Sequence, residues 1–156
     1  NNDLSLVNVR ARFRMTSLYY YAQMNNYLVV GTGNKVEDFG IGFFTKYGDG
    51  GVDISPIADL LKTEVYQLSK ELGVNNDILI APPTDGLWGD DRTDEDQLGA
   101  SYDELEWAMK AQEAGKEIAD FTGRLQEVYK IYLRLNKANL HKMNPIPVCE
   151  IPENLK

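Results

Sequence analysis

Apolar residues at a spacing of three to four positions predict helices along most of the chain. The first predicted helix follows Asn8, a good N-cap residue, and ends at residues 25–26 (Asn-Asn). We expect its buried stripe to contain Val9, Phe13, Leu18 and Tyr21.

Three further helices are predicted from capping residues and periodicity. One begins at Ser55, an N-cap followed by proline at the first helical position, and closes at Gly73. Another begins at the capping box of residues 101–104 (Ser-Tyr-Asp-Glu), and the longest begins near Lys116. Residues 144–147 (Asn-Pro-Ile-Pro) cannot be helical, so the helical part ends before them.

Residues 27–30 (Tyr-Leu-Val-Val) are an unbroken apolar run, which is typical of a strand buried on both faces of a parallel sheet. A sheet needs more than one strand, so we expect the chain to be part of a larger α/β domain. Residues 31–55 are rich in glycine and lack periodicity, and irregular segments of that length are usually functional or disordered. The aromatic residues in this segment make disorder the weaker interpretation.

Composition narrows the class of protein. The 156 residues are 43% hydrophobic and have a net charge of −8, which argues against a nucleic-acid partner and against an anionic membrane surface. One cysteine, Cys149, and one histidine, His141, exclude an internal disulfide and a structural zinc site formed by this chain alone. The first residues do not have the pattern of a secretory signal, so we expect a cytoplasmic protein.

Residues 31–37 (Gly-Thr-Gly-Asn-Lys-Val-Glu) are the first candidate site, because ligands bind where the strands of open parallel sheets end. The glycines allow close approach of a ligand, Thr32 offers a hydroxyl, and Glu37 could hold a divalent cation. The segment is neither a P-loop nor a dinucleotide fingerprint. A plain turn from strand to loop explains it equally well.

The second candidate site is residues 43–53, where Lys46 places a cation near the flexible pair Gly50-Gly51. A surface turn held by two phenylalanines is the plainer interpretation. Lys62 lies early in its predicted helix, where a cation opposes the helix dipole, and this hints at an anionic partner. We interpret the acidic cluster as a solvated loop and helix start capped by Thr93; its members are Asp90, Asp91, Asp94, Glu95 and Asp96.

Several segments resemble successive motifs of the NAD synthetases and occur in the same order, and residues 44–51 (Phe-Thr-Lys-Tyr-Gly-Asp-Gly-Gly) are the most specific part of them. His141 and Lys142 match near the end of the chain. The segments are residues 8–15, 30–38, 42–53, 61–65, 81–88, 93–95 and 98–103.

The resemblance implies an α/β fold of the adenine nucleotide α-hydrolase type, a parallel sheet flanked by helices. Residues 1–156 would be the C-terminal part of this single domain. The implied activity is the last step of NAD biosynthesis: ATP adenylates the carboxylate of deamido-NAD, pyrophosphate leaves, and nitrogen attack gives NAD and AMP. The implied partners are these substrates, Mg²⁺ and a second copy of the chain in a homodimer.

The resemblance also assigns roles by motif, without a catalytic residue among them. Glu37 would bind Mg²⁺. The contacts to ATP would be Thr32, Lys62 and Thr84, and the contacts to deamido-NAD would be Arg12, Lys46, Asp53, His141 and Lys142.

Two departures from the family pattern bear on function. The pyrophosphate-binding loop Ser-Gly-Gly-x-Asp-Ser is not in this sequence, so we expect no turnover by the chain alone. Residues 33–34 (Gly-Asn) stand where many ammonia-dependent members have Asp-His. The segment between Glu37 and Phe43 is also one residue longer than in those members. Ammonia and glutamine therefore both stay open as nitrogen donors. The alternatives are a related ATP pyrophosphatase that acts on another acid, and a non-catalytic fragment for nucleotide binding or dimerisation.

Overall fold

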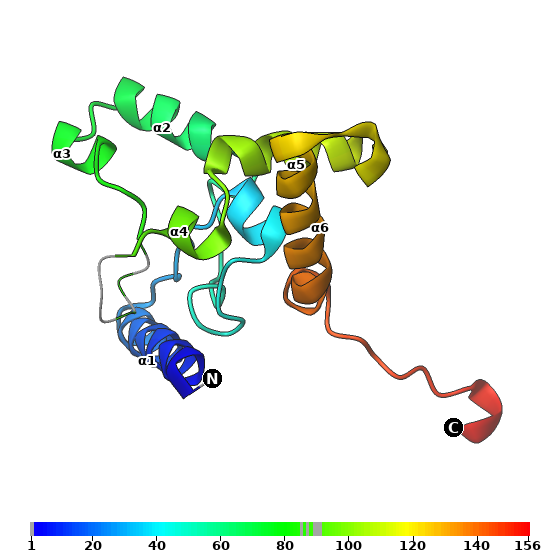
Figure 1. Ribbon diagram of the computed structural model, residues 1–156. Coiled ribbons are helices and arrows are strands. Elements are labelled where there is room, and N and C mark those ends of the chain that lie inside the picture. The colour runs from blue at the N-terminus through cyan, green and yellow to red at the C-terminus, as the bar shows by residue number, and fades with distance from the viewer. Residues whose placement is uncertain (1, 85, 87, 89–91) are drawn as a thin grey trace.

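The computed structural model describes residues 2–84, 86, 88 and 92–156, and their regular structure is helical (Figure 1). A long first helix lies at one end, helices α5 and α6 cross at the centre, and the C-terminal segment extends away from them. The elements are α1 (Asn2–Asn25), the π-helix η1 (Lys35–Ile41), α2 (Lys62–Glu71), α3 (Asn76–Leu79), α4 (Asp94–Leu98), α5 (Tyr102–Glu113), the 3₁₀ turn η2 (Ile118–Asp120), α6 (Gly123–Met143) and the 3₁₀ turn η3 (Glu153–Leu155).

The main core lies where α5, α6 and η1 pack together. Leu105 of α5 and Val128 of α6 are completely buried there, and Val36 and Ile41 of η1 pack into the same cluster. Burial of four such aliphatic side chains gives a stabilisation of about 1.5 to 3 kcal/mol each, before the entropy cost of ordering the chain. This core fixes η1, and with it the residues on either side.

Helix α6 also holds η1 through polar contacts. Asn136, Asn139 and Lys142 donate hydrogen bonds of 2.7, 2.8 and 2.9 Å to the successive carbonyls of residues 40–42, and Lys142 donates a further one of 2.7 Å to Phe44. These side chains are three positions apart, so they share one face of α6. They satisfy carbonyls that the end of a helix leaves without partners.

Gly42 ends η1 in the left-handed conformation, with φ of +62°. A Cβ atom at this position would lie 2.5 Å from Cβ of Asn139. Both the backbone angle and the close approach of α6 therefore require glycine here.

Residues 27–30 form less sheet than their sequence predicts. Within the described residues the pairing is one parallel bridge between Val30 and Ile54, supported by a 2.7 Å bond from the Gly31 amide to the Ile54 carbonyl. The expectation of burial on both faces is wrong for this chain. Val29 is buried, whereas Tyr27, Leu28 and Val30 are exposed.

Helix α1 begins at Asn2, so the expected start at Asn8 is wrong. Asn8 lies inside the helix, and its side-chain oxygen accepts a 2.7 Å hydrogen bond from the Thr45 hydroxyl. The expected buried stripe is also wrong. Val7 and Ala11 are the buried apolar residues, and the exposed ones include Val9, Phe13, Leu18 and Tyr21.

Two other helix starts differ from the prediction. Residues 56–59 form a turn and α2 begins only at Lys62, although Gly73 does close it with a positive φ. The segment after Lys116 contains the short turn η2, and α6 begins at Gly123. The capping box at Ser101 and the cap at Thr93 are confirmed. Among the helices that the structure describes, none combines the length and the hydropathy of a membrane span.

Replacing Asn136 with alanine tests the contact between α6 and η1. Asn136→Ala leaves the Gly40 carbonyl without its 2.7 Å donor and should reduce the free energy of unfolding by about 1 to 2 kcal/mol. The control is Lys137→Ala on the exposed face of α6, for which a change below about 0.5 kcal/mol is expected. Urea denaturation followed by tryptophan fluorescence measures both, and equal losses would contradict the assigned contact.

Candidate functional site

An ion pair joins η1 to the start of α2. Nζ of Lys62 lies 2.7 Å from Oε1 of Glu37, and the two side chains are only 19% and 14% exposed. Asn34 caps η1 by accepting a 3.0 Å hydrogen bond from the Glu37 amide, which fixes the backbone from which the carboxylate projects. The structure therefore brings together Glu37, which the family resemblance assigns to Mg²⁺, and Lys62, which it assigns to ATP.

Tyr102, at the first turn of α5, completes this part of the site. Its ring lies under the Lys62 ammonium, with 4.8 Å between Nζ and the ring centroid, and its hydroxyl donates a 3.2 Å hydrogen bond to Asp94. Burial, followed by the nearby Glu37 carboxylate, raises the pKa of Tyr102 well above its ordinary value. The phenol is therefore a neutral hydrogen-bond donor at physiological pH.

Asp94 corrects part of the interpretation of the acidic cluster. It is 8% exposed and faces Tyr102, so it does not belong to a solvated loop. Glu95 accepts a 2.9 Å hydrogen bond from the Tyr102 amide, and Asp96 forms the capping box with Thr93. Asp90 and Asp91 lie outside the described residues.

Glu37 is the residue that the family resemblance assigns to magnesium. Within the described part of the chain, no group of three or more acidic, histidine or cysteine residues could enclose a metal. Mg²⁺ is usually bound through one or two carboxylates together with substrate phosphates. Glu37 would supply one such carboxylate, and it would have to share its Oε1 with the Lys62 ammonium at 2.7 Å.

A second group of predicted residues lines a cavity of about 390 Å³ between α1, the segment after η1 and the end of α6. It contains Arg12, Lys46, His141 and Lys142. Arg12 Nε donates a 3.3 Å hydrogen bond to the Lys46 carbonyl, and Lys46 Nζ donates to the His141 carbonyl. Burial lowers the pKa of Lys142. Four predicted contacts for deamido-NAD are therefore brought together by segments almost 100 residues apart.

The structure does not bring the other three predicted residues into this group. The carboxylate of Asp53 accepts hydrogen bonds from the Tyr19 hydroxyl (3.0 Å) and the Val29 amide (2.8 Å), so in this structure it holds α1 to residues 27–30. Thr32 lines a separate cavity of about 340 Å³. Thr84 is exposed and accepts a 3.3 Å hydrogen bond from the Gly86 amide.

Two residues with no role assigned from the sequence also belong to this region. Gln97 lines the 390 Å³ cavity, and its buried amide nitrogen has no hydrogen-bond acceptor among the described residues. Asp38 lines an adjoining cavity of about 210 Å³ that also contains Lys46 and Lys142. Its carboxylate fills the space beside Gly33, where a Cβ atom would be 1.9 Å from Oδ2. The signal in the sequence that points to Asp38 is Gly33, because a residue without a side chain leaves room for the Asp38 carboxylate.

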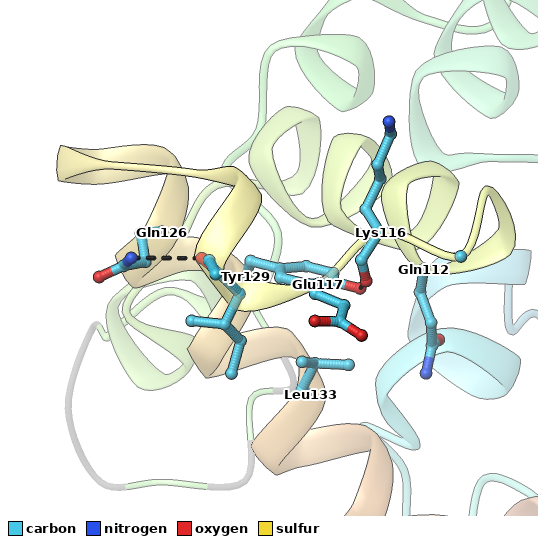
Figure 2. A pocket seen from close by; sticks show the side chains of 9 residues that line it. Gln112, Lys116, Glu117, Gln126, Tyr129 and Leu133 are labelled. Atoms are coloured by element: carbon cyan, nitrogen blue, oxygen red, sulfur yellow. Dashed lines mark hydrogen bonds between the residues drawn. The ribbon is translucent and has the colours of Figure 1, made fainter.

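A larger hollow of about 800 Å³ lies between the loop after α5 and the first half of α6 (Figure 2). Gln126 donates a 3.2 Å hydrogen bond to the Ile118 carbonyl, and the buried Tyr129 donates one of 2.6 Å to Lys116. These bonds hold the loop onto α6. The predicted ligand contacts that the structure describes lie elsewhere, so we do not assign this hollow to the site.

Comparison with known proteins identifies the family of the chain. The sequence model of the NAD synthase family matches residues 1–146. This chain belongs to the NAD synthase family. The NH(3)-dependent NAD(+) synthetase of Methanococcoides burtonii is 48% identical over 139 residues, which are 86% of this chain and 52% of that protein. The one of Carboxydothermus hydrogenoformans is 46% identical over 123 residues, 79% of this chain and 50% of that protein.

Two solved structures have a similar arrangement over most of this chain. The NMN synthetase of Francisella tularensis superimposes with a TM-score of 0.77 at 33% identity, covering 98% of this chain and 58% of that one. The NH3-dependent NAD synthetase of Campylobacter jejuni gives 0.70 at 28% identity, covering 94% and 56%. The chain thus spans about half the length of the relatives that it matches.

The buried carboxyl of Asp38 predicts a pH-dependent stability. Burial, with the nearby Glu37 and Asp49, raises its pKa from 3.8 to about 6. The folded state therefore favours the protonated form, and this contribution is present below pH 4 and lost as the pH rises through 6. Asp38→Asn should be more stable than the parent chain at pH 7.5, by about 1 to 3 kcal/mol, and equal to it near pH 4.

Urea denaturation at the two pH values checks this expectation. Asp103→Asn, which removes an exposed carboxylate from α5, is the control and should show no such difference between pH values. A parent chain that is as stable as Asp38→Asn at pH 7.5 would contradict the assigned burial of the charge.

Proposed function

We propose that this chain provides the substrate-binding part of an enzyme that converts deamido-NAD to NAD with ATP and ammonia, releasing AMP and pyrophosphate. The chain belongs to the NAD synthase family, and the observation that supports the proposal most is that two groups of candidate ligand contacts lie at the two ends of η1. Glu37 and Lys62 form one of them, and the cavity with Lys46 and Lys142 forms the other.

A carboxylate is a poor electrophile, so amidation requires that one of its oxygens become a good leaving group. Adenylation by ATP does this, with pyrophosphate as the first product and AMP as the second. Lys62 would contact the phosphates, and Thr32 and Thr84 would be further ATP contacts. Glu37 would hold a magnesium ion, which when bound offsets the charge that develops on the phosphate oxygens.

The cations of the 390 Å³ cavity suit a dinucleotide. Arg12, Lys46 and Lys142 line it together with His141, and the cationic arginine and lysine side chains in a concave site attract the negatively charged phosphates of a dinucleotide. Asp53 would be a further contact for deamido-NAD. Its present hydrogen bonds to Tyr19 and Val29 would have to be shared or exchanged for that purpose.

The proposed assembly follows from the exposed apolar residues. In a parallel sheet of the family fold, residues 27–30 would pair with strands from outside this chain, and the exposed Tyr27, Leu28 and Val30 would then be covered. We further propose a homodimer in the cytosol. The exposed apolar side chains of α1, which include Phe13 and Tyr21, are candidates for its interface.

The nitrogen donor and the acid substrate are chosen on the names of relatives. The M. burtonii and C. hydrogenoformans proteins are named as NH(3)-dependent, which favours ammonia over glutamine. The F. tularensis neighbour is named as an NMN synthetase. A mononucleotide acid whose amide is NMN is therefore the second candidate substrate.

A chimera tests the proposal. The segment of the M. burtonii synthetase matched by this chain is replaced with the corresponding residues of this chain, and NAD, NMN and AMP are measured by chromatography. Formation of NAD from deamido-NAD, ATP and ammonium supports the proposal. Faster amidation of the mononucleotide acid favours the second candidate, and no product with a folded chimera contradicts both. The chain alone should bind ATP or deamido-NAD without releasing pyrophosphate.

Lys46→Ala in the chimera should raise KM for deamido-NAD about tenfold or more, because a charged hydrogen-bond donor is lost from the cavity. KM for ATP should change less than about twofold, since Lys62 and Glu37 are untouched. Lys70→Ala, an exposed lysine in the last turn of α2, is the control. An unchanged KM for deamido-NAD would remove Lys46 from the site.

Glu37→Ala in the chimera should abolish Mg²⁺-dependent exchange of pyrophosphate into ATP, because the carboxylate proposed to hold the ion is gone. The exchange is measured with labelled pyrophosphate at saturating Mg²⁺ and deamido-NAD. Glu71→Ala, at the end of α2, serves as the control. Exchange at the parent rate in Glu37→Ala would refute its role.

A further inference from the structure

Helix α5 holds the dipeptide Lys62-Thr63 at two points. Tyr102 lies under the Lys62 ammonium, with 4.8 Å from Nζ to the ring centroid. Glu106, one turn later, accepts a 2.9 Å hydrogen bond from the Thr63 amide and a 2.8 Å hydrogen bond from the Thr63 hydroxyl. Residues four apart share a face of a helix, so one face of α5 makes both contacts.

The position of α2 depends strongly on the Glu106 carboxylate. The N-cap of α2 is Leu61, whose side chain cannot accept a hydrogen bond from the free amides of the first turn. Glu106 supplies the missing acceptor from another helix, and its negative charge lies at the favourable end of the α2 dipole. No residue of α2 is fully buried within the described structure, so packing contributes little to fixing its start.

Glu106 contacts Thr63 with both of its carboxylate oxygens, and this fixes the orientation of the dipeptide as well as its location. The side chain is 5% exposed, so solvent does not replace these bonds easily. Lys62 precedes Thr63 directly, and its Nζ is 2.7 Å from Glu37. A shift of the first turn of α2 would therefore separate Lys62 from Glu37.

We propose that Glu106 is a positioning residue of the ATP site: together with Tyr102 it forms a clamp on Lys62-Thr63 that holds the Lys62 ammonium at Glu37. The inference rests on the proposed function in one respect, that Lys62 contacts ATP. The clamp itself rests on the contacts between α5 and α2.

Hydrogen exchange in the chain alone tests the clamp without any substrate. The amides of residues 62–65 should exchange faster in Glu106→Gln and in Thr63→Val than in the parent chain. Thr63→Ser keeps the hydroxyl and should exchange at the parent rate. The matched control is Glu104→Gln on the same helix, because Glu104 binds Ser101 and Arg124 and makes no hydrogen bond to α2 within the described residues. Faster exchange at residues 62–65 in Glu104→Gln as well would overturn the clamp.

Kinetics of the chimera test the consequence for ATP. Glu106→Gln and Thr63→Val should each raise KM for ATP about tenfold, with KM for deamido-NAD changed by less than about twofold. The double variant should be no worse than the poorer single variant, because both substitutions remove the same interaction. Equal effects on the two KM values, or additive effects, would indicate general destabilisation and overturn the proposal.

Lys62→Ala separates the clamp from the proposed function. If it raises KM for ATP while Glu106→Gln and Thr63→Val do not, the clamp is refuted and the role of Lys62 stands. If Lys62→Ala leaves KM for ATP unchanged, the ATP role of Lys62 fails, and the positioning role of Glu106 fails with it.

Discussion

The hydrogen bonds from α6 to the end of η1 are the contact on which both candidate sites depend. A helix that ends inside a protein leaves carbonyl groups that must find donors, and here Asn136, Asn139 and Lys142 supply them. Glu37 lies just before these carbonyls in the chain and Lys46 just after them. The same three side chains thus determine where Glu37 and the 390 Å³ cavity lie relative to each other.

Local signals in the sequence were sufficient for some elements. The capping box at Ser101, the cap at Thr93 and the stop at Gly73 each act within one turn, and all three are present. The helix start predicted at Ser55 is wrong, and a long-range contact lies at this point of the chain. The Leu60 carbonyl accepts a 2.8 Å hydrogen bond from the Lys35 amide, which no local pattern in the sequence reveals.

The site was predictable only as far as motif resemblance extends. The resemblance gave proposed roles to Glu37, Lys62 and the four residues of the 390 Å³ cavity, and the structure groups these residues in two places. It gave no role to Glu106, because that role depends on a contact with Thr63 across 43 residues. The burial pattern of α1 was equally out of reach, since its apolar residues occur around the whole helix and tertiary contacts alone decide which are covered.

The π-helical form of η1 has a consequence for the length of this segment. A π-helix is usually an α-helical turn that has taken in an extra residue, and such turns occur often at functional sites. At the start of η1 the Lys35 amide donates a 2.8 Å hydrogen bond to the Leu60 carbonyl, and at its end the carbonyls of residues 40–42 accept bonds from α6, so both ends are tied to other parts of the molecule. The extra residue is therefore absorbed by the wider turn between two fixed points. A wider turn between two fixed ends can hold one residue more than an α-helical turn without moving the groups on either side.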